Sequence, residues 1–205
     1  MKRILLLILF ALMGLSLWVG LCQATERGKT MPTLKGKRVL LIIASQNFRD
    51  EEFQQPKELL EAQGVKISVA SSSLAEATGT LGMKAKADIL LNQVKVSDYD
   101  GLVFVGGGGA REYYNNAQAH EIAQGTVAQG KILGAICIAP VILANAGLLS
   151  GKKAAVFSSE IESIRTKGAI YTGQDVERDG QIITASGPSA ATEFGKALIT
   201  ALAAN

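Results

Sequence analysis

The sequence has few of the residues that build disulfide scaffolds and metal sites. It contains two cysteines and one histidine in 205 residues. Structural metal sites usually combine several cysteine or histidine ligands at short, regular spacing. The single histidine, His120, has no such partner and is expected to be a surface or helix-cap residue. No metal ion is therefore predicted.

A large excess of one charge is also missing. The formal net charge is +3, and two of the positive charges, Lys2 and Arg3, lie in an N-terminal segment without acids. Without residues 1–24, 19 basic side chains would face 18 acidic ones. This balance gives no support to a nucleic-acid partner. Hydrophobic residues make up 48% of the chain, which is long enough for one domain with a substantial core.

The first 24 residues have the pattern of an export signal. Two basic residues precede an apolar stretch over residues 4–21, and the small residues Cys22 and Ala24 place a cleavage site before Thr25. The expected protein is therefore exported, either periplasmic or secreted. Two alternatives stay open. A retained stretch of this length would anchor the chain in a membrane, and Cys22 would accept a lipid, although Leu21 is large for the preceding position.

Cleavage of the signal would leave one cysteine in the mature chain. Cys137 would then stand alone, so no internal disulfide is predicted. Residues 25–37 are polar, with glycine and proline, and are interpreted as a linker before a single domain over residues 38–205. A lone cysteine in an exported protein is either buried and inert or a free thiol with a function. The choice between the two decides the function of this chain.

The domain sequence alternates between strand and helix patterns, without internal repeats. Apolar runs predict strands over residues 38–44, 66–70, 102–105, 132–136 and 154–157. Helices are predicted over residues 56–63, 117–129, 140–146 and 188–203, and a hairpin over residues 176–184. Continuously apolar strands that alternate with helices predict an α/β fold, with a mostly parallel central sheet covered on both faces.

Catalytic groups in such sheets gather beyond the carboxyl ends of the strands. Glu52 follows the first strand, shortly before Pro56, and Cys137 follows the fourth. Cys137 stands between a strand and a helix that begins near Pro140, which is the geometry of a nucleophile elbow. The start of that helix would favour a thiolate. The alternative is a buried cysteine that only fills space.

Glu52 has a simpler interpretation as an exposed acid at the start of a helix. If it lies beside Cys137, an ionised carboxylate would raise the pKa of the thiol, whereas a protonated one would donate a hydrogen bond to the sulfur. The pairing therefore predicts a Glu52 pKa raised by burial. It also predicts a pKa for the Cys137 thiol below the ordinary value of about 8.5.

Four glycines, Gly106–Gly109, follow the third strand and allow the backbone to approach a ligand closely. They do not complete a dinucleotide fingerprint, since Arg111 and Glu112 stand where its third glycine is needed. No phosphate-binding lysine follows either, so no cofactor is predicted. Two alternatives stay open for these glycines: a tight turn, or a set of N–H donors for an oxyanion facing Cys137.

Taken as an ordered set, the motifs resemble the DJ-1/PfpI (ThiJ) superfamily over residues 37–203. The matching pieces are the E-x-x-x-P of Glu52–Pro56, YDGLVFVGG of Tyr99–Gly107, AIC of Ala135–Cys137, ANAGLLSGKK of Ala144–Lys153, and VERDGQIITASGP through EFG of Val176–Gly195. The resemblance implies a flavodoxin-like three-layer α/β/α sandwich that forms a homodimer. It implies an oxidation-prone nucleophile at Cys137, its acidic partner at Glu52, and an oxyanion hole from the N–H groups of Gly107 and Ile138.

The chain departs from the family pattern at three places. Peptidase-like members carry a histidine directly after the cysteine, where this chain has Ile138, and other members carry one in the region that reads Val156–Ser158 here. The arginine that many members carry before Gly187 is Ser186. Without a Cys-His pair, a peptidase would lack its usual acid and base. The chain is therefore more similar to the DJ-1-like branch than to the protease branch.

Three functions are expected, in decreasing order. The first is a cofactor-free enzyme, glyoxalase- or deglycase-like, in which Cys137 adds to a small reactive carbonyl compound and Glu52 transfers the proton. The second is a protective protein without turnover, whose Cys137 reacts with an oxidant. The third is a cysteine hydrolase or peptidase. A membrane partner is expected only if residues 4–21 are retained.

Overall fold

The computed structural model describes residues 34–205. The expected signal or anchor over residues 1–24, and most of the expected linker over residues 25–37, lie outside the described residues. Leu34 is buried, and its N–H donates to the carbonyl oxygen of Gln63 at 2.7 Å, so the packing of the domain already includes this residue. Within residues 34–205, no helix is long and apolar enough to cross a membrane.

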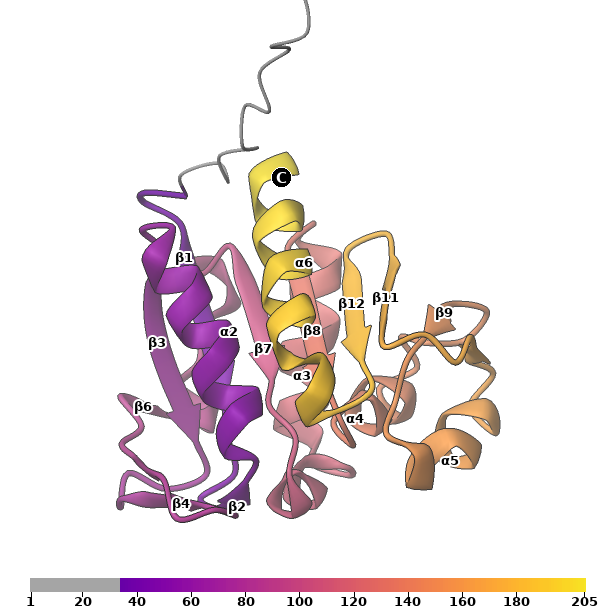
Figure 1. Cartoon of the computed structure of the whole chain (residues 1–205), viewed down its shortest axis with the longest axis horizontal. Helices are drawn as coiled ribbons and strands as arrows, with labels where there is room; N and C mark the ends of the chain where they lie inside the picture. The colour runs from indigo at the N-terminus through magenta and orange to yellow at the C-terminus, as the bar shows by residue number, and fades with distance from the viewer. Residues whose placement is uncertain (1–33) are drawn as a thin grey trace, which may run out of the picture. The chain divides into compact units, whose positions relative to one another are not determined.

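A seven-stranded sheet forms the centre of the domain, in the order β11-β12-β8-β7-β1-β3-β6 (Figure 1). Its strands are β1 (Arg38–Ile42), β3 (Lys66–Ser71), β6 (Ile89–Leu90), β7 (Gly101–Phe104), β8 (Ile132–Ile136), β11 (Val176–Asp179) and β12 (Ile182–Ala185). Every neighbouring pair is parallel except β11 and β12, which form the predicted hairpin. The predicted α/β fold with a mostly parallel sheet is confirmed.

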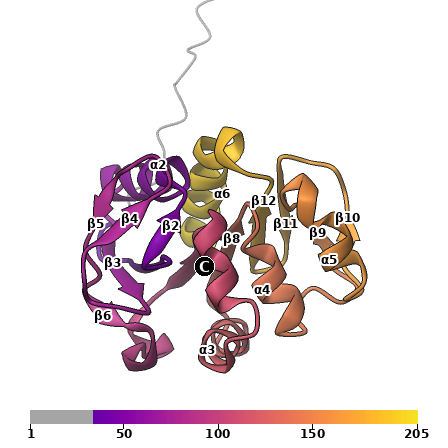
Figure 2. The ribbon, with the colours of Figure 1, turned by 90° about the horizontal axis from the view of Figure 1, so that it is seen from below.

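Helices cover both faces of this sheet (Figure 2). On one face, α2 (Asp50–Ala62) and α6 (Ala191–Ala204) pack against each other. On the other face lie α3 (Ala117–Ala128) and α4 (Pro140–Asn145), with α5 (Ile161–Arg165) packed on α4. The view along the sheet in Figure 2 separates the two pairs clearly, and the result is a three-layer sandwich.

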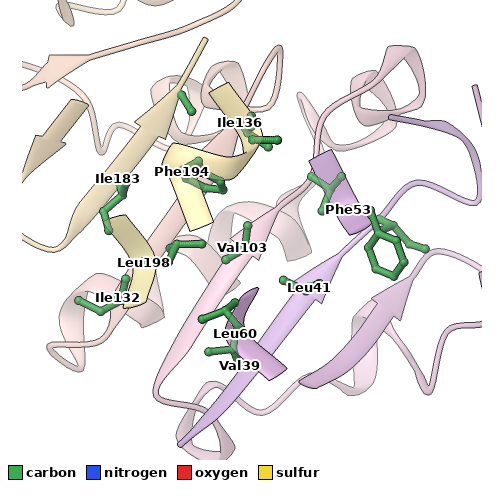
Figure 3. Close-up of a cluster of buried hydrophobic side chains, with 14 of the residues drawn as sticks. Val39, Leu41, Phe53, Leu60, Val103, Ile132, Ile136, Ile183, Phe194 and Leu198 are labelled. Carbon is green, nitrogen blue, oxygen red and sulfur yellow. The ribbon is translucent and has the colours of Figure 1, made fainter. Parts of the chain in front are cut away.

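The two faces of β1 explain why this strand is apolar throughout. Val39 and Leu41 belong to the core on the side of α2 and α6, whereas Leu40 and Ile42 belong to the core on the opposite side. Successive side chains of a strand point to opposite faces, so a strand with helices on both sides needs an apolar residue at every position. Figure 3 shows the first core, with Val39, Leu41, Val103, Ile132, Ile136 and Ile183 from the sheet against Phe53, Leu60, Phe194 and Leu198 from the helices.

The strand predicted over residues 154–157 is largely wrong. Only β9 (Lys153–Ala154) forms, and it pairs with β10 (Ile170–Tyr171) in a separate two-stranded sheet. The place beside β8 in the main sheet belongs to β12. The backbone of the predicted strand bonds elsewhere, since the N–H of Ala155 donates to the hydroxyl of Thr184 at 2.8 Å. Its apolar side chains reflect burial rather than membership of the main sheet.

The helix predicted from Pro56 begins six residues earlier, at Asp50, so Pro56 lies inside it. Its first turn contains the three acids Asp50, Glu51 and Glu52. Negative side chains are favourable at a helix N-terminus, because they face the unpaired N–H groups and the positive end of the helix dipole. This placement puts Glu52 directly at the end of the sheet where Cys137 follows β8.

Candidate active site

Cys137 occupies the corner between β8 and α4, where the sequence predicts it. Its φ of 65° lies in the left-handed region, which is uncommon for a residue other than glycine. Its N–H donates to Ala185 at 2.9 Å, and its carbonyl oxygen accepts from the N–H of Phe157 at 2.8 Å. These bonds to two separate segments hold the residue in its strained conformation. The corner therefore has the backbone geometry of a nucleophile elbow.

Glu52 reaches this corner from the first turn of α2 and is fully buried. An ideal Cβ placed on Gly106 would lie 2.4 Å from Glu52 Oε2 and 2.5 Å from Cys137 Cβ, so the two side chains are neighbours across Gly106. Among residues 34–205, neither carboxyl oxygen has a hydrogen-bond partner at standard distance and angle. The polar groups next to the carboxyl group are the Cys137 thiol and the Gly106 N–H. The interpretation of Glu52 as an exposed helix-start acid is wrong.

The two titrating groups shift each other. Burial raises the pKa of Glu52 to about 7, as the sequence predicts. Burial and the charge of the Glu52 carboxylate raise the pKa of the Cys137 thiol to about 12, against the opposing effect of the Gly107 and Ile138 N–H groups. The prediction of a lowered thiol pKa is therefore wrong. Above pH 7 the pair keeps one proton, which resides on the sulfur and leaves Glu52 as a carboxylate.

Gly107 supplies one of the two N–H groups that interact with the sulfur, and Ile138 supplies the other. Gly107 has a φ of +92°, and an ideal Cβ on it would lie 2.3 Å from the backbone nitrogen of Arg49 and 2.5 Å from the carbonyl oxygen of Asn47. Only glycine fits this crowded, left-handed position. The glycine run therefore makes a tight turn and also brings a donor to Cys137.

Cys137 lines a pocket of about 250 Å³ at the carboxyl ends of the strands. The lining residues are Arg49, Thr80, Gly107, Gly108, Arg111, Cys137, Ile138, Phe157, Ser159 and Pro188. A larger hollow of about 480 Å³ lies between α2, β3 and β5 (Lys84–Ala85), but neither Cys137 nor Glu52 lines it. Because the smaller pocket is the one that reaches the sulfur, it is the candidate active site.

Three positions where members of the DJ-1/PfpI superfamily carry histidine or arginine hold no basic residue in this chain. Ile138 and Phe157 form apolar walls of the pocket. The hydroxyl of Ser186 donates to Asp175 at 3.1 Å, and Ser186 does not line the pocket. His120 lies on α3, 2.9 Å from the carbonyl oxygen of Tyr114. Residues 34–205 contain no group of three or more side chains suited to hold a metal ion.

Two arginines of the pocket were not predicted as site residues. Arg49 follows β2 (Gln46–Phe48) and binds the carboxylate of Glu51 through Nε and Nη2, at 2.8 and 2.9 Å. Arg111 donates to Glu160 at 2.7 Å. In the sequence Arg111 is visible only as the residue that interrupts the glycine fingerprint. The position of Arg49 between the first predicted strand and Glu52 was a usable signal, since ligands gather beyond strand ends.

The sequence matches the profile of the DJ-1/PfpI family over residues 37–201. A protein of Methanocaldococcus jannaschii is 37% identical over 197 residues, which cover 95% of this chain and 96% of that protein. The protein named deglycase PfpI of Pyrococcus furiosus is 28% identical over 73% of this chain and 90% of its own length. Both matches therefore extend over most of the two chains compared.

Solved structures give the same result. The ThiJ/PfpI domain protein from Brachyspira murdochii has a TM-score of 0.81 and 30% identity, covering 83% of this chain and 99% of that one. Drosophila melanogaster DJ-1beta has a TM-score of 0.75 and 28% identity, covering 82% and 91%. The match to the family profile includes the segments that carry Glu52, Gly107 and Cys137. The chain thus has the flavodoxin-like α/β fold of these proteins and belongs to the DJ-1/PfpI family.

Proposed function

We propose that this protein is a cofactor-independent enzyme that acts on small reactive carbonyl compounds through Cys137 and Glu52. The proposal depends above all on the buried pair of thiol and carboxyl groups at the end of a small pocket. A carboxyl group with a pKa of about 7 accepts and returns protons readily at physiological pH. The name of the Pyrococcus furiosus relative, a deglycase, agrees with carbonyl chemistry.

The first step uses Glu52 as a base, because the thiol itself is not ionised near neutral pH. The sulfur of Cys137 adds to the aldehyde carbon of the substrate while its proton passes to the Glu52 carboxylate. The carbonyl electrons move to oxygen, and the N–H groups of Gly107 and Ile138 stabilise the charge that develops there. Glu52 gives the proton to this oxygen, which forms the hemithioacetal and restores the Glu52 carboxylate as the base for the next step. The raised thiol pKa is thus compatible with catalysis when the base lies alongside.

A 2-oxoaldehyde then needs no external oxidant. Glu52 removes the hydrogen of the former aldehyde carbon as a proton and returns a proton to the neighbouring carbon, through an enediol. The first carbon is oxidised to a thioester and the second is reduced to an alcohol, so the electrons balance. Water hydrolyses the thioester, which releases a 2-hydroxy acid and restores the Cys137 thiol. The volume of the pocket, about 250 Å³, suits a substrate of this size.

The experiment is to incubate the purified protein with methylglyoxal and to measure both loss of the dicarbonyl and formation of lactate. Cys137→Ala is expected to abolish the reaction, and Glu52→Gln to slow it by about 10²-fold or more, since a general base contributes rate factors of this order. Equal turnover by the wild type and Cys137→Ala would contradict the proposal.

A redox-responsive protein without turnover is the second candidate. The two Glu52 oxygens have no full hydrogen bond to a described residue. The protonated carboxyl group could therefore donate to an oxygen atom of a sulfenic or sulfinic Cys137. Peroxide would supply that oxygen and be reduced to water. Mild peroxide should add one or two oxygen atoms to Cys137 by intact and peptide mass, and an unchanged mass would rule this candidate out.

We also propose that the protein is exported after cleavage at Ala24, and that it forms a homodimer. Cell fractionation with N-terminal sequencing tests the first proposal, because an exported, cleaved chain starts at Thr25. A full-length chain in the membrane fraction would instead indicate a retained anchor. Light scattering after size exclusion tests the second, and a monomeric mass would contradict it. A peptidase finds no support in the apolar residues Ile138 and Phe157.

A further inference from the structure

The charged side chains that line the pocket at Cys137 are all of one sign. Two of its lining residues, Arg49 and Arg111, are cationic, and none of the residues that line it is acidic. The acids that pair with these arginines, Glu51 and Glu160, are not among the lining residues. The remaining walls are backbone, hydroxyl groups and apolar side chains. A bound molecule would therefore meet positive charge and no negative side chain on the pocket surface.

A buried glutamate and a tyrosine ring hold the Arg111 side chain in position. Its Nη2 donates to Glu160 Oε1 at 2.7 Å, and Glu160 is itself buried, with its second oxygen held by the Ser163 hydroxyl at 2.7 Å. The guanidinium group lies over the ring of Tyr114, 5.8 Å from its centroid. Among residues 34–205, the Arg111 side chain forms its hydrogen bond with Glu160, so its other guanidinium N–H groups remain available. Planar guanidinium groups held in this way are well suited to carboxylate and phosphate.

Arg49 is a weaker candidate for binding an anion. Its Nε and Nη2 both bind the carboxylate of Glu51, so this pair is already bidentate. Asp50 and Glu52 lie close enough to interact with its charge as well. Its positive charge is therefore largely compensated within the protein, whereas Arg111 faces only Glu160 in its ion pair.

We propose that the carbonyl substrate carries an anionic group, and that Arg111 binds this group while Cys137 attacks the aldehyde. The inference rests on the proposed function and narrows it to 2-oxoaldehydes that bear a carboxylate or phosphate. Arg111, together with the Ser159 hydroxyl, holds the anion at the pocket wall, and Ile138 and Phe157 cover the carbon chain. The product is an anionic 2-hydroxy acid.

The first test measures charge selection at Cys137 without requiring turnover. Iodoacetate is an anion and iodoacetamide is its neutral counterpart, and both alkylate the same sulfur. The ratio of their rates on Cys137 should fall about tenfold in Arg111→Met, the size expected when a hydrogen bond to a charged group is lost. Arg111→Lys should restore part of the ratio.

The matched control is Arg165→Met. Arg165 also pairs with a glutamate, Glu162, at 2.8 Å, and also lies over a tyrosine ring, that of Tyr171 at 5.3 Å. Its side chain is 50% exposed, against 54% for Arg111, but it does not line the pocket. This variant should leave the ratio unchanged. An equal fall in both variants, or no fall in Arg111→Met, would overturn the inference.

The second test compares 4,5-dioxopentanoate, a carboxylated 2-oxoaldehyde, with neutral methylglyoxal. Wild type should show the higher kcat/KM with the carboxylated compound, and Arg111→Met should lose this preference mainly through KM. Turnover of methylglyoxal without any preference would overturn the inference and leave the proposed function intact. If neither compound is turned over but the alkylation ratio still depends on Arg111, the proposed function is overturned. Anion binding by Arg111 would remain supported.

If Arg111→Met does not fold, as judged by its thermal melt, the salt dependence of alkylation in the wild type tests the inference instead. Attraction by Arg111 makes the ratio of iodoacetate to iodoacetamide rates fall as salt is raised, because ions screen a partly exposed charge. A ratio that is constant or that rises with salt would contradict a positive subsite.

Discussion

Glu52 and Cys137 lie side by side because Gly106, which separates their backbones, has no side chain. Any Cβ at residue 106 would fall within 2.5 Å of both Glu52 Oε2 and Cys137 Cβ. The three residues come from α2, from the turn after β7 and from the corner after β8, so their contact exists only in the folded sheet. The contact places a buried acid against a thiol, and it determines how both groups titrate.

The rate of Cys137 alkylation by iodoacetamide should report this coupling. In the wild type we expect the rate to rise through a pH near 7, because loss of the Glu52 proton creates a base beside the thiol. The Glu52→Gln variant should lack this inflection. Its thiol pKa should also lie below that of the wild type, since the Glu52 charge is one of the causes that raise it. An inflection near pH 7 that survives in Glu52→Gln would assign it to another group.

The stability of the fold should fall between about pH 4.5 and pH 7 because of Glu52. Its pKa of about 7 in the folded state exceeds the ordinary value of 4.5, so the folded protein binds the proton more tightly than the unfolded chain. The contribution of Glu52 protonation to the free energy of unfolding is complete below pH 4.5 and is lost as pH rises through 7. The pKa difference corresponds to about 3 kcal/mol.

Urea unfolding of the wild type and Glu52→Gln at pH 5 and pH 8 measures this effect. Glutamine stays neutral, so we expect the variant to match the wild type at pH 5 and to be more stable at pH 8. Glu61→Gln, an exposed change on the same helix, should show no such difference. A Glu52→Gln variant that is less stable at pH 8 than the wild type would contradict a buried, strained carboxylate.

Gly106→Ala should damage both the fold and the site. Its new methyl group would meet Cys137 Cβ at 2.5 Å and the Ile136 carbonyl oxygen at 2.7 Å, neither of which moves freely. Overpacking of this kind costs about 1–3 kcal/mol. Gly125→Ala is the control, because its Cβ would lie at an ordinary 3.6 Å from Val96 Cγ2 and Gly125 does not line the pocket. Urea unfolding and the alkylation rate of Cys137 measure the two effects, and equal behaviour of both variants would refute the crowding at Gly106.

Asp50→Ala should destabilise the turn that leads from β4 (Ala77–Gly79) to β5. The buried Asp50 carboxylate accepts from the N–H groups of Leu81 and Met83 at 2.8 and 2.7 Å, and these bonds lower its pKa. Without this acceptor the two N–H groups are left unpaired, which should lower the free energy of unfolding by about 2–3 kcal/mol. Because Thr80 of this turn lines the pocket, the reactivity of Cys137 should change as well.

The control for this prediction is Glu61→Ala, which removes an exposed partner of Lys57 on the same helix. A surface pair of this type contributes less than about 1 kcal/mol. Urea midpoints at pH 7 compare the two variants, and proteolysis within residues 79–83 reports the turn directly. If Asp50→Ala is no less stable than Glu61→Ala, the carboxylate does not hold the turn.

Most of the fold could be predicted from hydrophobic patterns. The bounds of β8 agree with the predicted range, because a strand covered on both faces is apolar at every position. The end of α3 lies within one residue of the predicted end, because Gly130 follows the helix. The error at residues 154–157 has a physical origin. Val156 is as buried as a strand residue, but β12 occupies the edge of β8 with which it would have paired. A pattern of burial does not say which neighbour a strand has.

The site could be predicted in part. Positions after strands indicated Glu52, the glycines of residues 106–109 and Cys137, and the family resemblance indicated the Gly107 N–H as a donor. These residues meet at one end of the sheet. The direction of the thiol pKa could not be predicted, because it depends on how far burial and a charged neighbour outweigh two N–H donors. Arg111 was missed because it lies in η3 (Gly108–Tyr113), a short 3₁₀ helix after the glycines that the hydrophobic pattern did not predict.

The order of apolar and polar residues along the chain was sufficient to specify the layers, the parallel sheet and the corners that hold reactive residues, since these depend on local periodicity and on turn chemistry. Only the tertiary structure decided between an exposed and a buried Glu52, placed its carboxyl group beside the Cys137 thiol, and brought Arg111 to the same pocket. These properties depend on distances between segments far apart in the chain. Because burial and charge act through space, they set the protonation of the pair and the charge of the ligand it would accept.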